Sequence, residues 1–297
     1  MQLTVYILVY PWLWLISRLP FKIIYFISDG LFLLVYYVIG YRKKVVRYNL
    51  ALVFPEKPQE RRLHIEKRFY RHMCDMFLEM IKTMGISNEE LQRRFTFDNL
   101  GLLHRLEARN RSVMLMFPHY ASWEWVIALD THIGSKGYAI YQKLGNKYFD
   151  QLVRNIRQKF DTTLITTKET WALVDQNKRA GILGTYGILS DQSPMVKKAL
   201  LWTSFMGITV PAHTGAETLC RKLDLAAVYL KVNKIKRGHY HGSFKLITAK
   251  EMKRFELTES FLKMTEESIK EAPEYYLWTH KRWKHMGKTP RTSKQNQ

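Results

Sequence analysis

Cysteine is scarce in this sequence, which contains only Cys74 and Cys220. Two cysteines so far apart cannot supply the closely spaced thiols of a zinc site or a disulfide framework. We therefore expect two buried, reduced thiols and no metal centre. This cysteine usage is compatible with a reducing location that faces the cytoplasm.

Three common catalytic signatures are missing as well. The sequence has no Gly-x-Ser-x-Gly nucleophile elbow, no Gly-x-x-x-x-Gly-Lys phosphate loop and no Gly-x-Gly-x-x-Gly dinucleotide fingerprint. A serine hydrolase, an NTPase and a dehydrogenase therefore lack support. No motif in the sequence predicts a bound cofactor, and we expect none.

Acidic residues are few relative to basic ones. The 297 residues include 26 Asp and Glu against 47 Lys and Arg, which gives a formal net charge of +21. So large an excess indicates an anionic partner: nucleic acid, a membrane surface or an acidic protein. With 46% hydrophobic residues, the chain is too apolar for disorder and long enough to bury a sizeable core.

Residues 1–40 are strongly apolar, yet they do not form a clean membrane span. The run 3–16 is shorter than the roughly 20 residues that a spanning helix needs. The run 23–39 contains Asp29, and a central Asp costs roughly 2.5–3.5 kcal/mol on insertion scales. The segment either spans a membrane once or lies at the interface as a pair of helices, and we favour both over two core helices of a soluble protein. The basic residues within 41–47 predict a cytoplasmic flank that binds anionic headgroups.

Apolar runs and helical patterns alternate along the rest of the chain. We expect strands at 112–118, 137–141, 164–165, 181–189 and 226–232, and helices at 60–84, 100–108, 146–160, 170–177, 216–223 and 258–272. This alternation predicts an α/β fold with a mostly parallel central sheet flanked by helices, preceded by the apolar N-terminal helical segment.

His119 follows the expected buried strand 112–118, and Glu124 lies near the start of an expected helix at 121–129. Residues five apart diverge in one continuous helix, but they can converge across a strand–turn–helix corner. A histidine held by a carboxylate is a general base that can deprotonate a hydroxyl. The alternative is a structural hydrogen bond between His119 and Glu124 at a helix cap.

Other polar residues follow the same pattern less strongly. Asp191 and Gln192 follow the run 181–189, and ligands bind beyond the carboxyl ends of parallel strands, so Asp191 and His119 could face one crevice. On its own, Asp191 equally fits a turn. Arg154 and Arg157 lie on a basic helix, where a solvated face is the usual outcome unless a phosphate is bound.

Two aromatic and basic segments remain open to interpretation. Residues 276–284 interleave aromatic and basic side chains, which fits nucleic-acid binding, contact with a membrane interface or an ordinary surface helix. His239 and His241 flank Tyr240 in what we expect to be a polar turn, and without further ligands at metal-binding spacing we treat them as surface residues.

Taken together, these residues resemble the lipid A late acyltransferase family of lauroyl and myristoyl acyltransferases, within the lysophospholipid acyltransferase superfamily. The segments that carry the resemblance are 47–50, 54–56, 117–124, 141–157, 191–192, 205–207, 215–216, 276–278 and 282–284. Residues 117–124 resemble the family's His-four-Glu motif, and residues 191–192 its Asp-Gln or Asp-His block. Ser190 departs from the family, because many members have proline there.

The resemblance implies an O-acyltransferase of lipid A and lipopolysaccharide biosynthesis. A fatty acyl group would pass from an acyl thioester to a hydroxyl of a lipid A precursor, with His119 as general base and Glu124 orienting it. The donor would be an acyl carrier protein or coenzyme A, and we favour the carrier. Arg157, then Arg154, Asp191 and Gln192 are the candidates for binding substrate or the oxyanion.

The resemblance also implies an arrangement along the chain. Residues 1–40 would form a membrane anchor or interfacial helices, residues 41–287 the acyltransferase domain, and residues 288–297 a disordered polar tail. The protein would lie at the bacterial inner membrane, with its catalytic domain facing the cytoplasm. Its partners would include an anionic membrane surface but no nucleic acid.

Two other functions compete with this one. The same chemistry could act on an amino-acid lipid or a lysophospholipid, because acceptor choice depends on pocket shape. A basic, non-catalytic protein that binds membrane or nucleic acid is the alternative from another class, and the His119–Glu124 pair argues against it.

Overall fold

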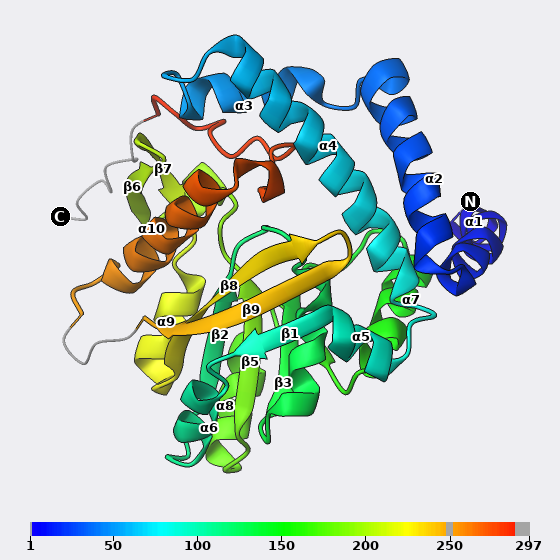
Figure 1. Ribbon diagram of the computed structural model, residues 1–297. Helices are drawn as coiled ribbons and strands as arrows, with labels where there is room; N and C mark the ends of the chain where they lie inside the picture. Colours follow the sequence, from blue (N-terminus) through cyan, green and yellow to red (C-terminus); the bar gives the residue numbers. More distant parts are fainter. Residues whose placement is uncertain (1, 248–251, 289–297) are drawn as a thin grey trace.

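A seven-stranded sheet lies at the centre of the computed structural model, which describes residues 2–247 and 252–288 (Figure 1). Its strands are β1 (Phe95–Asp98), β2 (Val113–Phe117), β3 (Lys136–Tyr141), β4 (Thr163–Thr166), β5 (Gly184–Leu189), β8 (Ala226–Lys236) and β9 (His239–Leu246). They are arranged in the order β1-β9-β8-β2-β5-β3-β4, and β8 with β9 is the antiparallel pair. The other neighbours run parallel, so the predicted α/β class with a mostly parallel sheet is confirmed.

Helices cover both faces of this sheet. They are α1 (Gln2–Arg18), α2 (Phe21–Leu33), α3 (Lys43–Val53), α4 (Gln59–Lys82), α5 (Asn88–Arg94), α6 (Gly101–Glu107), α7 (Lys147–Gln158), α8 (Thr170–Arg179), α9 (Gly215–Leu223) and α10 (Glu256–Glu271). Shorter helical segments are η1 (Leu34–Ile39), η2 (Glu124–His132), η3 (Val196–Lys198) and η4 (Pro273–Tyr275). Helices α9 and α10 contact β8 on one side of the sheet, whereas η2 contacts β1 and β3 on the other.

The central strand β2 shows why the sheet is buried on both faces. All five of its residues are buried, as expected for a continuous apolar run in a parallel sheet rather than an alternating one. β2 lies between β5 and β8 and pairs in parallel with both. The predicted buried thiols are also observed: Cys74 and Cys220 are buried, and burial raises the pKa of each to about 12.

Several strands were not predicted from the sequence. His239 and His241, expected in a polar turn, lie on β9, which pairs with β1 and β8. Tyr240 between them is buried, so the segment alternates between a covered and an open face. A small hairpin of β6 (Leu201–Phe205) and β7 (Ile208–Ala212) forms a second sheet. The expected disordered tail falls mostly on residues 289–297, outside the described residues.

The apolar N-terminal segment forms helices that lie beside the long helix α4 (Figure 1). Residues Phe21–Ile39, which comprise α2 and η1, are long and apolar enough to cross a membrane by length and composition. Their neighbour α4 is the helix predicted at 60–84, and its buried side contains charged as well as apolar residues. The N-terminal helices therefore lie against the rest of the protein along one side.

Candidate active site

The register of two parallel strands brings His119 and Asp191 together. Phe117 at the end of β2 is opposite Leu189 at the end of β5. His119 and Asp191 each follow two residues later, so they leave the sheet at the same level. The two residues expected to face each other beyond the carboxyl ends of the strands thus lie in direct contact, at the edge where parallel α/β sheets bind ligands.

The Asp191 carboxylate holds the imidazole of His119. Its Oδ1 lies 2.7 Å from His119 Nδ1, and it also accepts a hydrogen bond of 3.1 Å from the backbone N–H of His119. Burial raises the pKa of Asp191, but the charge of His119 and these hydrogen bonds outweigh burial, so the pKa lies below its usual value. Asp191 is therefore ionised and only accepts, which places the imidazole proton on Nδ1.

The other imidazole nitrogen, Nε2, is an acceptor. The Gln192 side-chain amide lies 3.2 Å from His119 Nε2 and donates to it, since Nδ1 already carries the proton. The Trp123 ring packs edge-on against the imidazole, with 5.2 Å between ring centroids. The tautomer and orientation of His119 are thus set from three sides, as general-base catalysis requires.

Glu124 does not have the partner that the sequence led us to expect. Its Oε2 forms an ion pair of 2.6 Å with Nη2 of Arg157 on α7, and Asp191, not Glu124, contacts His119 Nδ1. The turn before Glu124 sets the direction of its side chain. Ala121 has φ +51°, and η2 is a 3₁₀ helix that begins at Glu124. The two carboxylates of the site therefore have different partners, the His119 imidazole for Asp191 and the Arg157 guanidinium for Glu124.

The structure also separates the two candidate arginines. Arg154 pairs with Asp150 on its own helix at 3.2 Å and stacks over Tyr141. Of the two, Arg157 reaches Glu124, so it is the arginine that lies beside the His119 turn. A small cavity of about 60 Å³ borders this ion pair, and most of the side chains that line it are apolar.

The turn that carries His119 is fixed by hydrogen bonds from distant segments. Ala121 donates its N–H to the Tyr275 carbonyl at 3.0 Å, and the His119 carbonyl accepts from Leu277 N–H at 3.1 Å. The Ala121 carbonyl lies 3.3 Å from His72 Nε2. These contacts hold Ala121 in a left-handed conformation that costs a non-glycine residue roughly 1–2 kcal/mol.

His72 is a buried residue that the sequence analysis did not identify. Burial and the nearby Lys234 ammonium hold the pKa of His72 well below its usual value, so the ring is neutral. Lys234 Nζ lies 3.2 Å from Nδ1 and donates to it, which leaves the Nε2–H to donate to the Ala121 carbonyl. No motif in the sequence marks this residue, which lies on the charged helix α4.

The C-terminal segment 276–284 is part of the core behind this turn. Trp278, Arg282 and Trp283 are buried, so the surface helix and the exposed binding surface considered for this segment are wrong. Arg282 Nη1 donates to Ser193 Oγ and the Pro211 carbonyl, both at 3.1 Å. The aromatic residues interleaved in this segment were the signal for burial.

Asn49 on α3 joins the N-terminal part of the domain to this segment. Its Nδ2 donates to the carbonyls of Trp278 and His280 at 2.8 and 2.9 Å.

Tyr276 is fully enclosed, and burial together with the Asp191 charge raises its pKa well above the usual value. Within the described residues, no three His, Cys, Asp or Glu side chains gather as ligands of a metal would.

Comparison with known proteins identifies the family. The sequence model of the bacterial lipid A biosynthesis acyltransferases matches residues 1–285. The chain belongs to this family. The resemblance inferred from its motifs is thereby confirmed, and so is the prediction of an O-acyltransferase.

Individual relatives are similar over most of this acyltransferase. The lipid A biosynthesis palmitoleoyltransferase of Escherichia coli strain K12 is 24% identical over 283 residues, which cover 92% of this chain and 88% of the relative. The lauroyltransferase of the same organism is 24% identical over 279 residues, 92% of this chain and 89% of the relative. The myristoyltransferase is 23% identical over 173 residues, 58% and 54% of the two chains.

Proposed function

We propose that this acyltransferase moves a fatty acyl group from an acyl thioester to a hydroxyl of a lipid A precursor, with His119 as the general base. Family membership supports acyl transfer in lipid A biosynthesis. The observation that carries the catalytic assignment is the His119–Asp191 pair, which leaves an unprotonated Nε2 at the carboxyl ends of the strands. Asp191 then takes the orienting role that the sequence led us to assign to Glu124.

The reaction requires one proton to move twice. The acceptor hydroxyl gives its proton to His119 Nε2 as its oxygen bonds to the thioester carbonyl carbon. The carbon–sulfur bond then breaks, and the leaving thiolate takes the proton from Nε2. Asp191 stabilises the imidazolium between these two steps. The acyl group passes directly from donor to acceptor, so this route needs no nucleophile elbow.

In this proposal, the side chains of Arg157 and Gln192 supply hydrogen-bond donors to the site. The ion pair with Glu124 uses one part of the Arg157 guanidinium, whose remaining N–H groups can stabilise the tetrahedral oxyanion. Glu124 thus positions Arg157. Arg154 forms an ion pair with Asp150 on the same helix, and we assign it no contact with the reacting atoms.

The function is tested by lipid mass spectrometry of cells that lack the gene. We expect lipid A to lose one acyl chain, and wild-type protein to restore it. His119→Ala should fail to restore it, because the base is gone. His64→Ala, which changes an exposed histidine on α4, is the matched control and should restore it fully.

Other outcomes of this experiment would overturn parts of the proposal. Restoration by His119→Ala would contradict general-base catalysis by this residue. Loss of a chain from an amino-acid lipid or a lysophospholipid instead would assign a different acceptor. An intact lipidome, together with nucleic-acid binding that is sensitive to salt and survives His119→Ala, would favour the non-catalytic alternative.

We propose an acyl carrier protein as the donor, because its acidic surface complements the +21 charge of this chain. Exposed Lys143 and Lys147 lie at the connection from β3 to α7, the helix that carries Arg157. These two lysines would contact the acidic surface of the carrier as its acyl group enters the site. The same basic character supports the inner membrane, on the side facing the cytoplasm, as the location.

The carrier proposal predicts a charge effect on KM. Replacing Lys143 and Lys147 together by Glu should raise the KM for the acyl carrier several-fold with little change in kcat, and added salt should raise the wild-type KM. Lys178→Glu, which changes an exposed lysine on α8, serves as control and should have the wild-type KM. A KM that responds neither to salt nor to the double substitution would exclude electrostatic docking there.

A further inference from the structure

Helix α2 and its continuation η1 present one continuous face to α4. The buried residues of this face are Ile24, Ser28, Phe32 and Tyr36, which are spaced four residues apart along the chain. A four-residue spacing marks a single helical stripe, so the segment is attached along its whole length. Phe32 also lies beneath the guanidinium of Arg71 on α4.

Three hydrogen bonds to carboxylates of α4 reinforce this attachment. They are Tyr25 Oη to Glu79 at 2.9 Å, Ser28 Oγ to Asp75 at 2.7 Å and Tyr36 Oη to Glu66 at 2.9 Å. The three carboxylates are almost completely buried. Removing α2 and η1 from α4 would deprive these buried carboxylates of hydrogen-bond donors, which is more costly than losing the same bonds at the surface.

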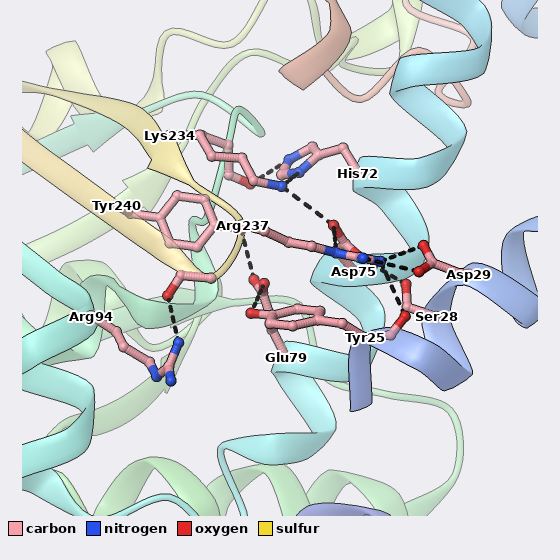
Figure 2. A network of polar contacts seen from close by, with 12 residues as sticks. Tyr25, Ser28, Asp29, His72, Asp75, Glu79, Arg94, Lys234, Arg237 and Tyr240 are labelled. Atoms are coloured by element: carbon pink, nitrogen blue, oxygen red, sulfur yellow. Dashed lines mark hydrogen bonds and ion pairs between the residues drawn. The ribbon is translucent and has the colours of Figure 1, made fainter. Parts of the chain in front are cut away.

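Asp29, which interrupts the apolar run, has a defined partner. Arg237, at the end of the β8–β9 hairpin, contacts Asp29 at 2.7 and 3.1 Å and Asp75 at 2.7 and 3.0 Å (Figure 2). Its guanidinium also lies over the Tyr25 ring. A carboxylate in this arrangement lies against the domain surface, where it does not incur the cost of the bilayer centre.

Helix α1 is held at both of its ends. Gln2 donates to the Gly145 carbonyl at 3.2 Å, next to the start of α7. At the other end, Lys82 Nζ donates to the carbonyls of Ser17 and Leu19 at 2.9 and 2.8 Å. A Cβ at Gly85 would lie 2.4 Å from the Ser17 carbonyl oxygen, so the contact there requires glycine.

The outward side of these helices is apolar and has basic borders. Its most exposed apolar side chains are Leu8, Trp12, Phe26, Tyr37, Val38 and Ile39. Arg18 and Lys22 flank the turn between α1 and α2, and Arg42 and Lys44 follow η1. An apolar surface with tryptophan and tyrosine, bordered by basic residues, has the chemistry of helices that lie in the headgroup region of an anionic membrane.

We propose that α1, α2 and η1 lie flat in one leaflet of an anionic bilayer and that none of them crosses it. This inference rests on the membrane association proposed above. A spanning arrangement would have to detach Phe21–Ile39 from α4 and separate Asp29 from Arg237. The in-plane arrangement keeps every one of these contacts and still buries the apolar side, to a depth of roughly 5–10 Å.

The arrangement also places lipid beside the site. Tyr6 of α1 packs against Tyr148 and Phe149 of α7, and α7 carries Arg157. A lipid acceptor in the same leaflet would therefore approach the site from the side that α7 covers, without leaving the membrane surface.

Labelling from one side of sealed vesicles tests this inference. We would place a single accessible cysteine in the full-length protein, either by Gln2→Cys or by Lys44→Cys, and add a maleimide that cannot cross membranes. Wild-type protein gives the background, because Cys74 and Cys220 are buried. The in-plane arrangement predicts that both variants are labelled from the same side, whereas labelling from opposite sides would show a span and overturn it.

A matched pair of substitutions tests the surface itself. Ile23→Glu changes an apolar residue of α2 that is 45% exposed, and Ile182→Glu changes one that is 44% exposed just before β5. In flotation with vesicles of phosphatidylglycerol and phosphatidylethanolamine, Ile23→Glu should lower the bound fraction several-fold and Ile182→Glu should not. Equal binding of both variants would contradict the proposed surface.

These experiments separate the inference from the proposed function. If wild-type protein fails to float with vesicles yet transfers acyl groups to detergent-dispersed lipid A precursor, membrane seating is wrong and the acyltransferase assignment stands. If it floats and is labelled from one side but transfers nothing, the seating stands and the catalytic proposal fails.

Discussion

Asp191→Asn is expected to lower kcat by about 10³–10⁴-fold while the protein stays folded. The carboxylate accepts from both the imidazole Nδ1–H and the backbone N–H of His119. Both bonds go to Oδ1, so an amide oxygen could still accept them, but a neutral amide cannot stabilise a positive ring, and the imidazolium would lose its counter-charge. The measurement is single-turnover kinetics with an acylated carrier and lipid A precursor, with circular dichroism as the check on folding.

The control for this experiment is another aspartate in an ion pair. Asp175→Asn on α8 removes a salt bridge with the exposed Arg179 and should leave kcat unchanged. Glu124→Gln should lower kcat by a smaller factor, about 10²–10³, because it acts through the position of Arg157. If Glu124→Gln were far more damaging than Asp191→Asn, the pairing originally expected between His119 and Glu124 would describe catalysis better.

The sequence was sufficient to predict the positions of His119 and Asp191 because each follows a short, mostly apolar run. Buried strands of a parallel sheet have such runs, and their carboxyl ends share one edge. The sequence does not state that β2 and β5 are neighbours, or that Phe117 is opposite Leu189. The direct hydrogen bond between His119 and Asp191 follows from that register alone.

The partner of Glu124 could not be predicted for a local reason. Its direction depends on Ala121 at φ +51° and on a 3₁₀ helix where an α-helix was expected. Alanine rarely adopts a left-handed conformation, and it does so here because Tyr275 and His72 bind its N–H and carbonyl. Those two residues come from segments distant in the sequence.

The charged helix α4 illustrates a second limit. In the sequence, its acidic residues look like the solvated side of an amphipathic helix. In the structure, Glu66, Asp75 and Glu79 are buried, with partners on α2, η1 and the β8–β9 hairpin. Composition does not distinguish a solvated carboxylate from a buried one whose donors lie far away along the chain.

Asp75→Ala is expected to destabilise the protein by about 3–5 kcal/mol, because it removes one member of a buried ion pair. The Asp75 side chain is 5% exposed and contacts Ser28, Lys234 and Arg237 (Figure 2). Without it, the buried Lys234 loses its carboxylate partner and Ser28 loses its acceptor. Thermal unfolding in detergent should show the melting temperature lowered by roughly 5–15 °C.

The neighbouring carboxylate gives a control that shares the same arginine. Asp29 also pairs with Arg237 but is 58% exposed, so Asp29→Ala should cost about 1 kcal/mol or less. Hydrogen exchange should rise along α2 in Asp75→Ala and stay low in Asp29→Ala, because the buried carboxylate holds the helix to α4. Equal effects of the two substitutions would mean that apolar packing alone attaches α2, and the in-plane seating would then lack its polar support.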